Sequence, residues 1–312
     1  MFQLMLGDCI TEMKTLPDQS VHTCVTSPPY FGLRDYGTKG QIGLEATPEA
    51  FVSRLVEVFR EVRRVLRDDG TLWLNLGDSY ANGGRKYRAP DKKARSAREM
   101  SVRPTDGAKP KDLLGVPWRV AFALQADGWY LRQDIIWHKP NPMPESVTDR
   151  CTKAHEYLFL LSKSPKYYFD SVAIKEESVD PAGSAARYKG AFGDAKNEHF
   201  LASDQVHTRS IGMREFDGKR NRRSVWTVTT KPYAGAHFAT FPPDLIEPCI
   251  LAGCPVGGTV LDPFGGSGTT AGVALKHGRR ALLCEVNPDY GKLMPSRIEL
   301  ISGMSSDAWS LI

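Results

Sequence analysis

The segment Val25–Gly32, with the sequence VTSPPYFG, combines groups that could activate a weak nucleophile. Its apolar run stops at Pro28 and Pro29, which predicts a buried strand that ends in a loop. The amino group on a nucleobase ring is a poor nucleophile, because its lone pair is delocalised into the ring. Acceptors on its two N–H groups would localise that pair. Ser27 Oγ and the Pro28 carbonyl are candidates for this role, with the Tyr30 ring stacked on an extruded base. A simple strand terminator is the alternative meaning of the Pro-Pro pair.

A second segment, Leu261–Val286, has the order of elements found in nucleotide sites. A strand leads into a turn that contains Gly265, Gly266 and Gly268, and a helix and a second strand that ends in Glu285 follow. Glycine lets the backbone approach a ligand closely, and an acid at the tip of the next strand can accept both ribose hydroxyls of an adenosine. The segment therefore predicts an adenosine-bearing cofactor. By itself it also fits a nicotinamide-dependent oxidoreductase, or a glycine-rich turn without a ligand.

Positive charge is concentrated in one part of the chain, residues 82–111. This segment holds ten Lys and Arg against three Asp and Glu, whereas the whole chain has a formal net charge of +5. Such a density favours contact with a polyanion, and a solvated loop without a partner is the alternative. The residues predicted to contact DNA phosphates here are Lys92, Lys93, Arg95 and Arg98. A second basic run, GKRNRR, adds Lys219, Arg220, Arg222 and Arg223.

Alternating strand and helix signals surround these segments and predict an α/β fold with a mixed sheet built from both ends of the chain. Helices are expected where apolar residues recur at steps of three and four, and strands in short apolar runs. The expected helices are 48–66, with Thr47 as cap, the first part of 116–142, 241–253, and 269–278, with Gly278 as cap. The expected strands are 20–30, 71–80, the second part of 116–142, 155–164, 258–264 and 279–286.

The periodicity fades between residues 170 and 231, which predicts an inserted region between two parts of one catalytic domain, 1–169 and 232–312. The six cysteines are scattered and no CxxC pair is present, so reduced thiols and no metal site are expected. No signal peptide and no apolar run long enough to cross a bilayer are visible, so a cytoplasmic protein is expected.

The VTSPPY and LDPFGGSGTT motifs together resemble those of the amino-methylating DNA methyltransferases. The catalytic motif precedes the cofactor motif, which is similar to the circularly permuted β class of that family. The resemblance implies a Rossmann-like methyltransferase fold, S-adenosylmethionine as cofactor and double-stranded DNA as substrate. It also implies that 170–231 is a target-recognition region, and that the methyl group is transferred directly without a metal.

The resemblance also implies a role for individual residues. The catalytic motif falls on Ser27, Pro28, Pro29 and Tyr30. The cofactor site falls on Asp8, His237, Asp262, Phe264, Gly265, Gly266, Gly268 and Glu285. His237 could equally be structural, and Trp137 could lie beside the target base or in the core.

Serine as the first residue of the catalytic motif resembles the cytosine-N4 subgroup, and adenine-N6 methylation is the alternative. Methylation at cytosine C5 needs a nucleophilic cysteine after proline, and Cys249 lies in an expected apolar helix instead. An oxidoreductase would leave the SPPY motif without a use. A non-catalytic DNA-binding regulator would have no use for the cofactor site. A protein-glutamine methyltransferase would have no use for the basic segment. A homodimer and a separate restriction endonuclease stay open as partners.

Overall fold

The computed structural model describes residues 1–33, 37–38, 40–81, 108–183, 217–230 and 241–305. The chain divides into two compact units. The larger unit consists of Met1–Asp170 and Ser224–Ile312, and the smaller one of Ser171–Arg223.

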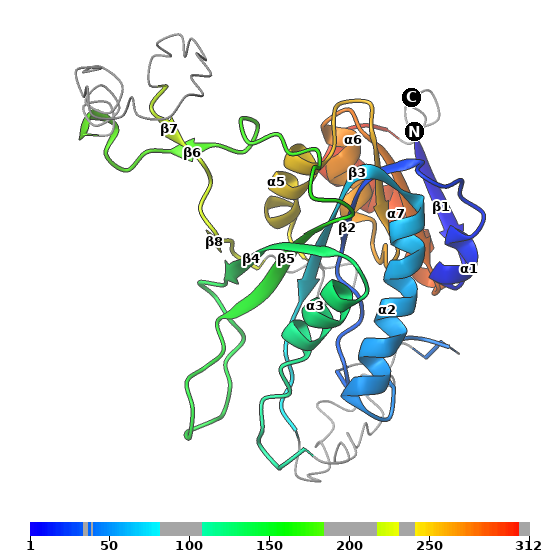
Figure 1. The fold of residues 1–312 in the computed structure, drawn as a ribbon, viewed down its shortest axis with the longest axis vertical. Coiled ribbons are helices and arrows are strands. Elements are labelled where there is room, and N and C mark those ends of the chain that lie inside the picture. Colours follow the sequence, from blue (N-terminus) through cyan, green and yellow to red (C-terminus); the bar gives the residue numbers. More distant parts are fainter. Residues whose placement is uncertain (34–36, 39, 82–107, 184–216, 231–240, 306–312) are drawn as a thin grey trace, which may run out of the picture. The chain divides into compact units, whose positions relative to one another are not determined.

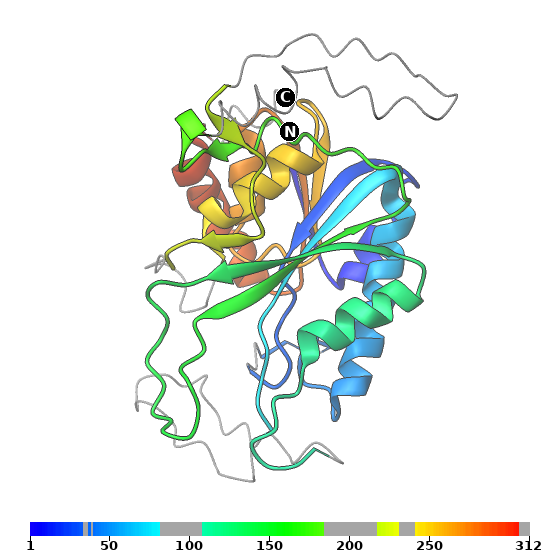
Figure 2. The same ribbon diagram turned by 60° about the vertical axis from the view of Figure 1, so that its left-hand side comes forward.

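The larger unit is an α/β domain built around one eight-stranded sheet (Figure 1). Its strands are β1 (Phe2–Leu6), β2 (Val21–Thr26), β3 (Leu66–Leu76), β4 (Tyr130–His138), β5 (His155–Ser162), β8 (Val225–Thr227), β9 (Thr259–Asp262) and β10 (Arg280–Glu285). Its helices are α1 (Cys9–Met13), α2 (Pro48–Val65), α3 (Val116–Ala126), α5 (Pro243–Gly253), α6 (Thr269–Lys276) and α7 (Pro288–Ser302). Figure 2 shows α2 and α3 on one face of the sheet and α5, α6 and α7 on the other.

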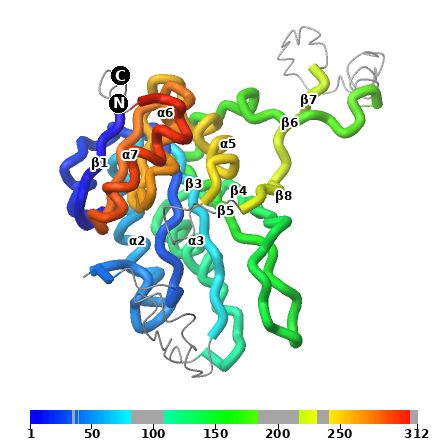
Figure 3. The backbone as a smooth tube through the Cα atoms, turned by 180° about the vertical axis from the view of Figure 1, so that it is seen from behind, coloured from blue at the N-terminus to red at the C-terminus, as the bar shows by residue number. Residues whose placement is uncertain are grey.

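The strand order is β1-β10-β9-β2-β3-β5-β4-β8. Strands β9 and β10 come from the C-terminal part of the chain, yet they lie between β1 and β2 (Figure 3). The first five strands in this order are parallel, whereas β5 is antiparallel to both of its neighbours. The prediction of a mixed sheet built from both ends of the chain is confirmed. As a consequence, the loops after β2 and β9 leave the same edge of the sheet, where ligands of open α/β sheets bind.

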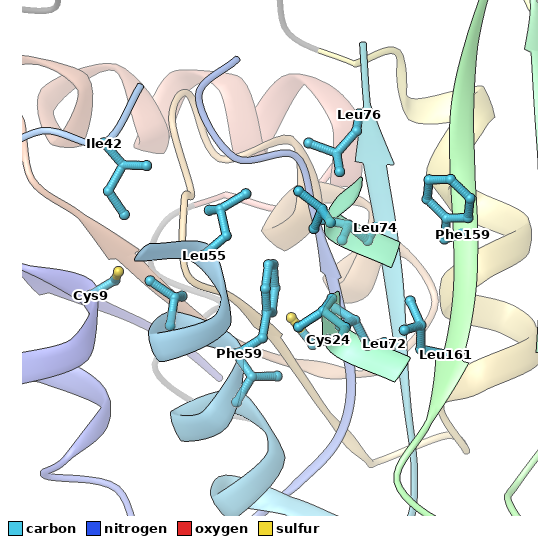
Figure 4. Close-up of a cluster of buried hydrophobic side chains, with 14 of the residues drawn as sticks. Cys9, Cys24, Ile42, Leu55, Phe59, Leu72, Leu74, Leu76, Phe159 and Leu161 are labelled. Atoms are coloured by element: carbon cyan, nitrogen blue, oxygen red, sulfur yellow. The ribbon is translucent and has the colours of Figure 1, made fainter. Parts of the chain in front are cut away.

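The core forms where the apolar face of α2 packs on the sheet (Figure 4). Thr47 caps this helix, because its side chain accepts a hydrogen bond from the Ala50 N–H at 3.1 Å. Leu55 and Phe59 of α2 then pack in one cluster with Leu72 on β3. This packing holds β3 in place beside β2. It therefore stabilises the edge of the sheet from which the loops with both predicted motifs leave.

The structure differs from the prediction at the start of β3, and it contains elements that were not predicted, among them β1 and α1 at the start of the chain. Strand β3 begins at Leu66, five residues earlier than expected, because the residue that ends α2 is already extended with φ −68° and ψ 140°. Helix α7 and strand β8 were not predicted. Strand β8 adds only three residues to the edge of the sheet, through its parallel pairing with β4.

The smaller unit contains a short antiparallel pair, β6 (Glu176–Glu177) and β7 (Lys219–Arg220). Ion pairs lie beside this pair of strands, and one of them joins Lys175 and Asp217 at 2.7 Å. No helix within the described ranges of the chain is long and apolar enough to span a membrane.

Candidate active site

A buried aspartate joins the two predicted motifs. Asp262 ends β9 and is 1% exposed. Its carboxylate accepts hydrogen bonds from the hydroxyls of Thr26 and Thr270, each at 2.6 Å, and from the Phe264 N–H at 3.0 Å. Burial raises the pKa of Asp262 to about 6. The carboxylate therefore ties the end of β2, the glycine-rich turn and α6 together.

The glycine-rich turn needs glycine for different reasons at different positions. Gly266 and Gly268 have φ values of +53° and +87°, in the left-handed region that favours glycine. At Gly265 a Cβ would lie 2.9 Å from the Leu283 Cβ, so a side chain there would push the turn away from β10. At Gly266 the nearest atom to a Cβ would be the Phe264 carbonyl oxygen at 3.9 Å, which leaves open space beside the backbone.

Glu285 closes the turn from the end of β10. It is 7% exposed, and its two oxygens accept hydrogen bonds from the Gly266 and Asn287 N–H groups, both at 2.8 Å. Burial raises the pKa of its carboxyl group. A carboxylate oxygen has more than one acceptor position, so the same oxygens can also accept from ribose hydroxyls.

Asp8 lies at the end of the neighbouring strand. The N–H of Gly7 donates to the Glu285 carbonyl at 2.9 Å, which places the end of β1 next to that of β10. The Asp8 side chain caps α1 by accepting from the Thr11 N–H at 3.1 Å, and it lies 3.5 Å from the Arg54 guanidinium. Its contacts are thus to protein groups, at the edge where the adenosine end of a cofactor is expected.

Two buried hydroxyls in the turn indicate room for a polar ligand. Ser267 Oγ and Thr269 Oγ1 are buried and have no hydrogen-bond partner among the described residues. A buried polar group without a partner costs about 1–3 kcal/mol. The residue that precedes α6, Gly268, also provides no side-chain cap for the helix. Together with the Glu285 carboxylate, these groups fit an adenosine-bearing cofactor that has an amino acid end.

The SPPY loop leaves β2 directly beside this turn, since Cys24 of β2 is paired with Leu261 of β9. Ser27 Oγ donates to the Tyr30 hydroxyl at 3.5 Å, and that hydroxyl donates to Glu156 Oε2 at 2.6 Å. The Tyr30 ring packs against the backbone of Gly77, where a Cβ would lie 2.5 Å from the ring. The structure thus brings the predicted catalytic and cofactor motifs together at one edge of the sheet.

Three polar residues beside Tyr30 were missed by the sequence analysis. Asn75 on β3 donates to Glu156 Oε2 at 3.2 Å and to the Tyr157 carbonyl at 3.1 Å. Lys139, which follows β4, forms an ion pair with Glu156 Oε1. The sequence did contain a signal for two of these residues, because Lys139 and Glu156 are charged and lie at the ends of two apolar runs. Their partners were not visible, because Glu156 and Tyr30 are 126 residues apart.

The open alternatives for two other residues are resolved by their surroundings. Trp137 is 3% exposed and its indole N–H donates to the Val228 carbonyl at 2.8 Å, so it belongs to the core between β4 and the segment after β8. Cys249 is buried in α5, where its thiol lies 3.6 Å from the Leu245 carbonyl oxygen.

The predicted DNA contacts are only partly within the described residues. Arg220 and Arg223 both contact Glu176 Oε1 at 2.9 Å, and Lys219 lies 3.9 Å from Glu177. Arg222 also lies in this run. The predicted residues outside the described ranges are Lys92, Lys93, Arg95, Arg98 and His237.

Comparisons with known proteins agree with this geometry. The family of DNA methylases that modify N6 or N4 matches residues 21–294. The type II methyltransferase M.Cfr9I of Citrobacter freundii is 51% identical over 298 residues, which cover 95% of this chain and 87% of that protein. Two solved structures share the fold. The PvuII DNA methyltransferase, described as cytosine-N4-specific, has a TM-score of 0.65 at 18% identity and covers 99% of this chain and 90% of its own. A DNA modification methylase of Thermus thermophilus, complexed with S-adenosyl-L-methionine, has a TM-score of 0.58 at 24% identity. The match covers 97% of this chain and 96% of that one.

Proposed function

The chain belongs to the family of N6- and N4-modifying DNA methylases, and from this premise we propose that it methylates the N4 amino group of cytosine at a specific sequence in double-stranded DNA. The family membership makes it an S-adenosylmethionine-dependent DNA methyltransferase with a Rossmann-like fold, as the sequence predicted. The choice of cytosine rests on one observation, namely that serine occupies the first position of the SPPY motif, at Ser27.

The proposed mechanism polarises the amine of an extruded base. S-adenosylmethionine supplies an electrophilic methyl group, and the residues proposed to hold it are Glu285, Asp8 and the turn around Gly266. Ser27 Oγ and the Pro28 carbonyl accept the two N–H groups of the target amine and localise its lone pair. Tyr30 stacks on the base. Catalysis thus depends on positioning and polarisation of the amine.

Asp262 is proposed to act as a positioning residue in this site. Its oxygens already accept three hydrogen bonds from protein groups, on the SPPY side, in the turn and at the start of α6. Because one carboxylate holds both motifs, the amine acceptors and the cofactor turn keep a fixed separation.

Binding of DNA is assigned to the two basic segments. Residues 82–111 are proposed to contact phosphates, which gives affinity without sequence preference, and residues 170–231 to read the recognition sequence. In the second segment Arg220 and Arg223 converge on the same oxygen of Glu176, which brings two guanidinium groups close together. The single Glu176 carboxylate offsets one of these two positive charges, and the remaining positive charge favours the approach of DNA.

We also propose that the enzyme works beside a separate restriction endonuclease. The relative from Citrobacter freundii, which is similar along nearly the whole chain, is named a type II methyltransferase. Type II modification implies a nuclease that cuts the same sequence when it is unmethylated.

The experiment that tests the proposal is sequencing of DNA from cells that express the protein, with a readout that separates N4-methylcytosine from N6-methyladenine. We expect N4-methylcytosine at one recurring sequence. N6-methyladenine at a recurring sequence would transfer the proposal to the adenine subgroup, and unmodified DNA would contradict it. A Ser27→Ala, Tyr30→Ala double variant is the control, and it should bind S-adenosylmethionine and leave the DNA unmodified.

A further inference from the structure

A line of three hydrogen-bonding groups leads from the catalytic loop into the protein. Ser27 Oγ donates to the Tyr30 hydroxyl at 3.5 Å, and Tyr30 donates to Glu156 Oε2 at 2.6 Å. The second distance is typical of a hydroxyl that donates to a carboxylate. The first is long, as catalytic hydrogen bonds often are before the substrate binds. The Tyr30 hydroxyl also lies 3.3 Å from Asn75 Oδ1, a longer contact than the one to Glu156. Because the Ser27 hydroxyl donates to Tyr30, the lone pairs of Ser27 Oγ are left to accept from an amine.

This direction matters because serine is not a base. An amine with two hydrogens becomes positively charged when it gains a methyl group, and it must then lose one proton. A carboxylate at position 27 could take that proton directly. The neutral hydroxyl of Ser27 can take it only if it passes its own proton on.

Glu156 is held in the orientation that such a transfer needs. The Lys139 ammonium is paired with Oε1, which leaves Oε2 facing Tyr30. Asn75 donates to the same Oε2 at 3.2 Å. The ammonium of Lys139 lies 4.3 Å above the ring of the buried Trp137, and the side chains of Lys139 and Glu156 are only 18% and 15% exposed. Residues on β3 and β5 and the residue directly after β4 thus fix one carboxylate oxygen on the Tyr30 hydroxyl.

We propose that Glu156 is the final proton acceptor of a relay through Ser27 and Tyr30, an inference that rests on the proposed function. The amine nitrogen forms a bond to the methyl carbon as the bond from that carbon to the sulfonium sulfur of S-adenosylmethionine breaks, and the neutral thioether leaves with the electron pair. The nitrogen then loses one proton to Ser27 Oγ. Ser27 gives its own proton to the Tyr30 oxygen, and Tyr30 gives its proton to Glu156 Oε2. Both hydroxyls end neutral, the carboxylate ends protonated, and solvent later removes that proton. Before the transfer, the same carboxylate polarises the two hydroxyls and makes Ser27 Oγ a stronger acceptor.

Two conservative variants test the relay. Glu156→Gln keeps a side-chain oxygen that can accept from Tyr30 but cannot take a proton, and Tyr30→Phe keeps the ring but removes the hydroxyl. With a duplex that carries the recognition sequence, we expect each variant to lower the single-turnover rate of methylation by about 10²–10³-fold. The KM for DNA and the Kd for S-adenosylmethionine should change little. The double variant should be no slower than the slower single variant, because both break one path.

A bypass distinguishes the relay from a structural role of Glu156. Ser27→Asp places a carboxylate directly at the amine, where it can take the proton itself. Adding Glu156→Gln to the Ser27→Asp variant should therefore lower the methylation rate much less than Glu156→Gln lowers it in the protein that keeps Ser27. Glu61→Gln is the matched control, since Glu61 is likewise paired with a basic side chain, Arg64 at 2.9 Å, and lies on α2. It should methylate at the wild-type rate.

An equal loss from Glu156→Gln in both backgrounds would overturn the relay, as would a Glu156→Gln protein with the wild-type rate. A wild-type protein that forms no N4-methylcytosine would contradict the proposed function itself. The two failures are therefore distinguishable.

Discussion

Replacement of the buried Asp262 by asparagine should change how the stability of the protein depends on pH. The carboxylate is 1% exposed and accepts only from neutral donors, two threonine hydroxyls and one backbone N–H. Burial raises its pKa from the ordinary 3.8 to about 6. The folded protein therefore binds a proton more tightly at this group than the unfolded chain does, and the stability it contributes is present below pH 3.8 and lost as the pH rises through 6.

The magnitude follows from the two pKa values. At about 1.4 kcal/mol for each pH unit, the difference between 3.8 and about 6 corresponds to about 3 kcal/mol, and about 2 kcal/mol of it should be lost between pH 4.5 and pH 7.5. Asparagine has no such titration. The free energy of unfolding of the wild type minus that of Asp262→Asn should therefore fall by about 2 kcal/mol between these two pH values.

Urea unfolding of the cofactor-free protein at several pH values, followed by circular dichroism, measures this difference. Asp289→Asn is the matched control, because the Asp289 side chain is 76% exposed on α7 and buries no charge. For each variant, the free energy of unfolding is subtracted from that of the wild type. If this difference had the same pH dependence for Asp262→Asn as for Asp289→Asn, the argument that Asp262 is ionised in an unfavourable buried site would be refuted.

Three further predictions concern the cofactor turn, the Tyr30 ring and the basic segment. Gly266→Asp should abolish binding of S-adenosylmethionine in calorimetry, because a carboxylate would fill the open space beside a left-handed residue; unchanged binding would contradict the assignment of the turn. Gly77→Ala should lower kcat by at least about tenfold with little effect on cofactor binding, because its Cβ would lie 2.5 Å from the Tyr30 ring; an unchanged kcat would show that the ring position is not critical. Alanine at four basic positions should weaken binding to all duplexes and flatten the dependence of log K on log salt by roughly 0.9 for each phosphate that is no longer neutralised; an unchanged salt slope or a changed recognition sequence would contradict that role. The four positions are Lys92, Lys93, Arg95 and Arg98.

The sequence predicts the parts of the fold that have a strong local signal. Helix α2 was placed to within one residue, because its apolar spacing and the cap at Thr47 are both local. The glycine-rich turn and Glu285 were predicted to lie together, and the Gly266 N–H does donate to Glu285. The early start of β3 was missed, because the Asp-Asp-Gly run is typical of a turn, whereas here it forms an irregularity within β3, between Leu66 and Thr71, which pair with Val21 and Thr23 of β2.

The contacts that complete the site could not be predicted, because they join segments that are distant in the chain. Glu156 reaches Tyr30 only because β5 runs antiparallel to β3, with Tyr157 opposite Leu76. Asp262 was predicted as a cofactor contact, but its hydrogen bond with Thr26, 236 residues away, was not predicted. Both depend on strand register, which a local apolar pattern does not specify.

The measurement that tests the central claim most directly uses purified protein, S-adenosylmethionine with a labelled methyl group, and duplex DNA that is then digested to nucleosides. The proposed function requires the label to appear in N4-methyldeoxycytidine, and to be absent when the Ser27→Ala, Tyr30→Ala variant is used. Label in N6-methyldeoxyadenosine, or in no nucleoside, would contradict it.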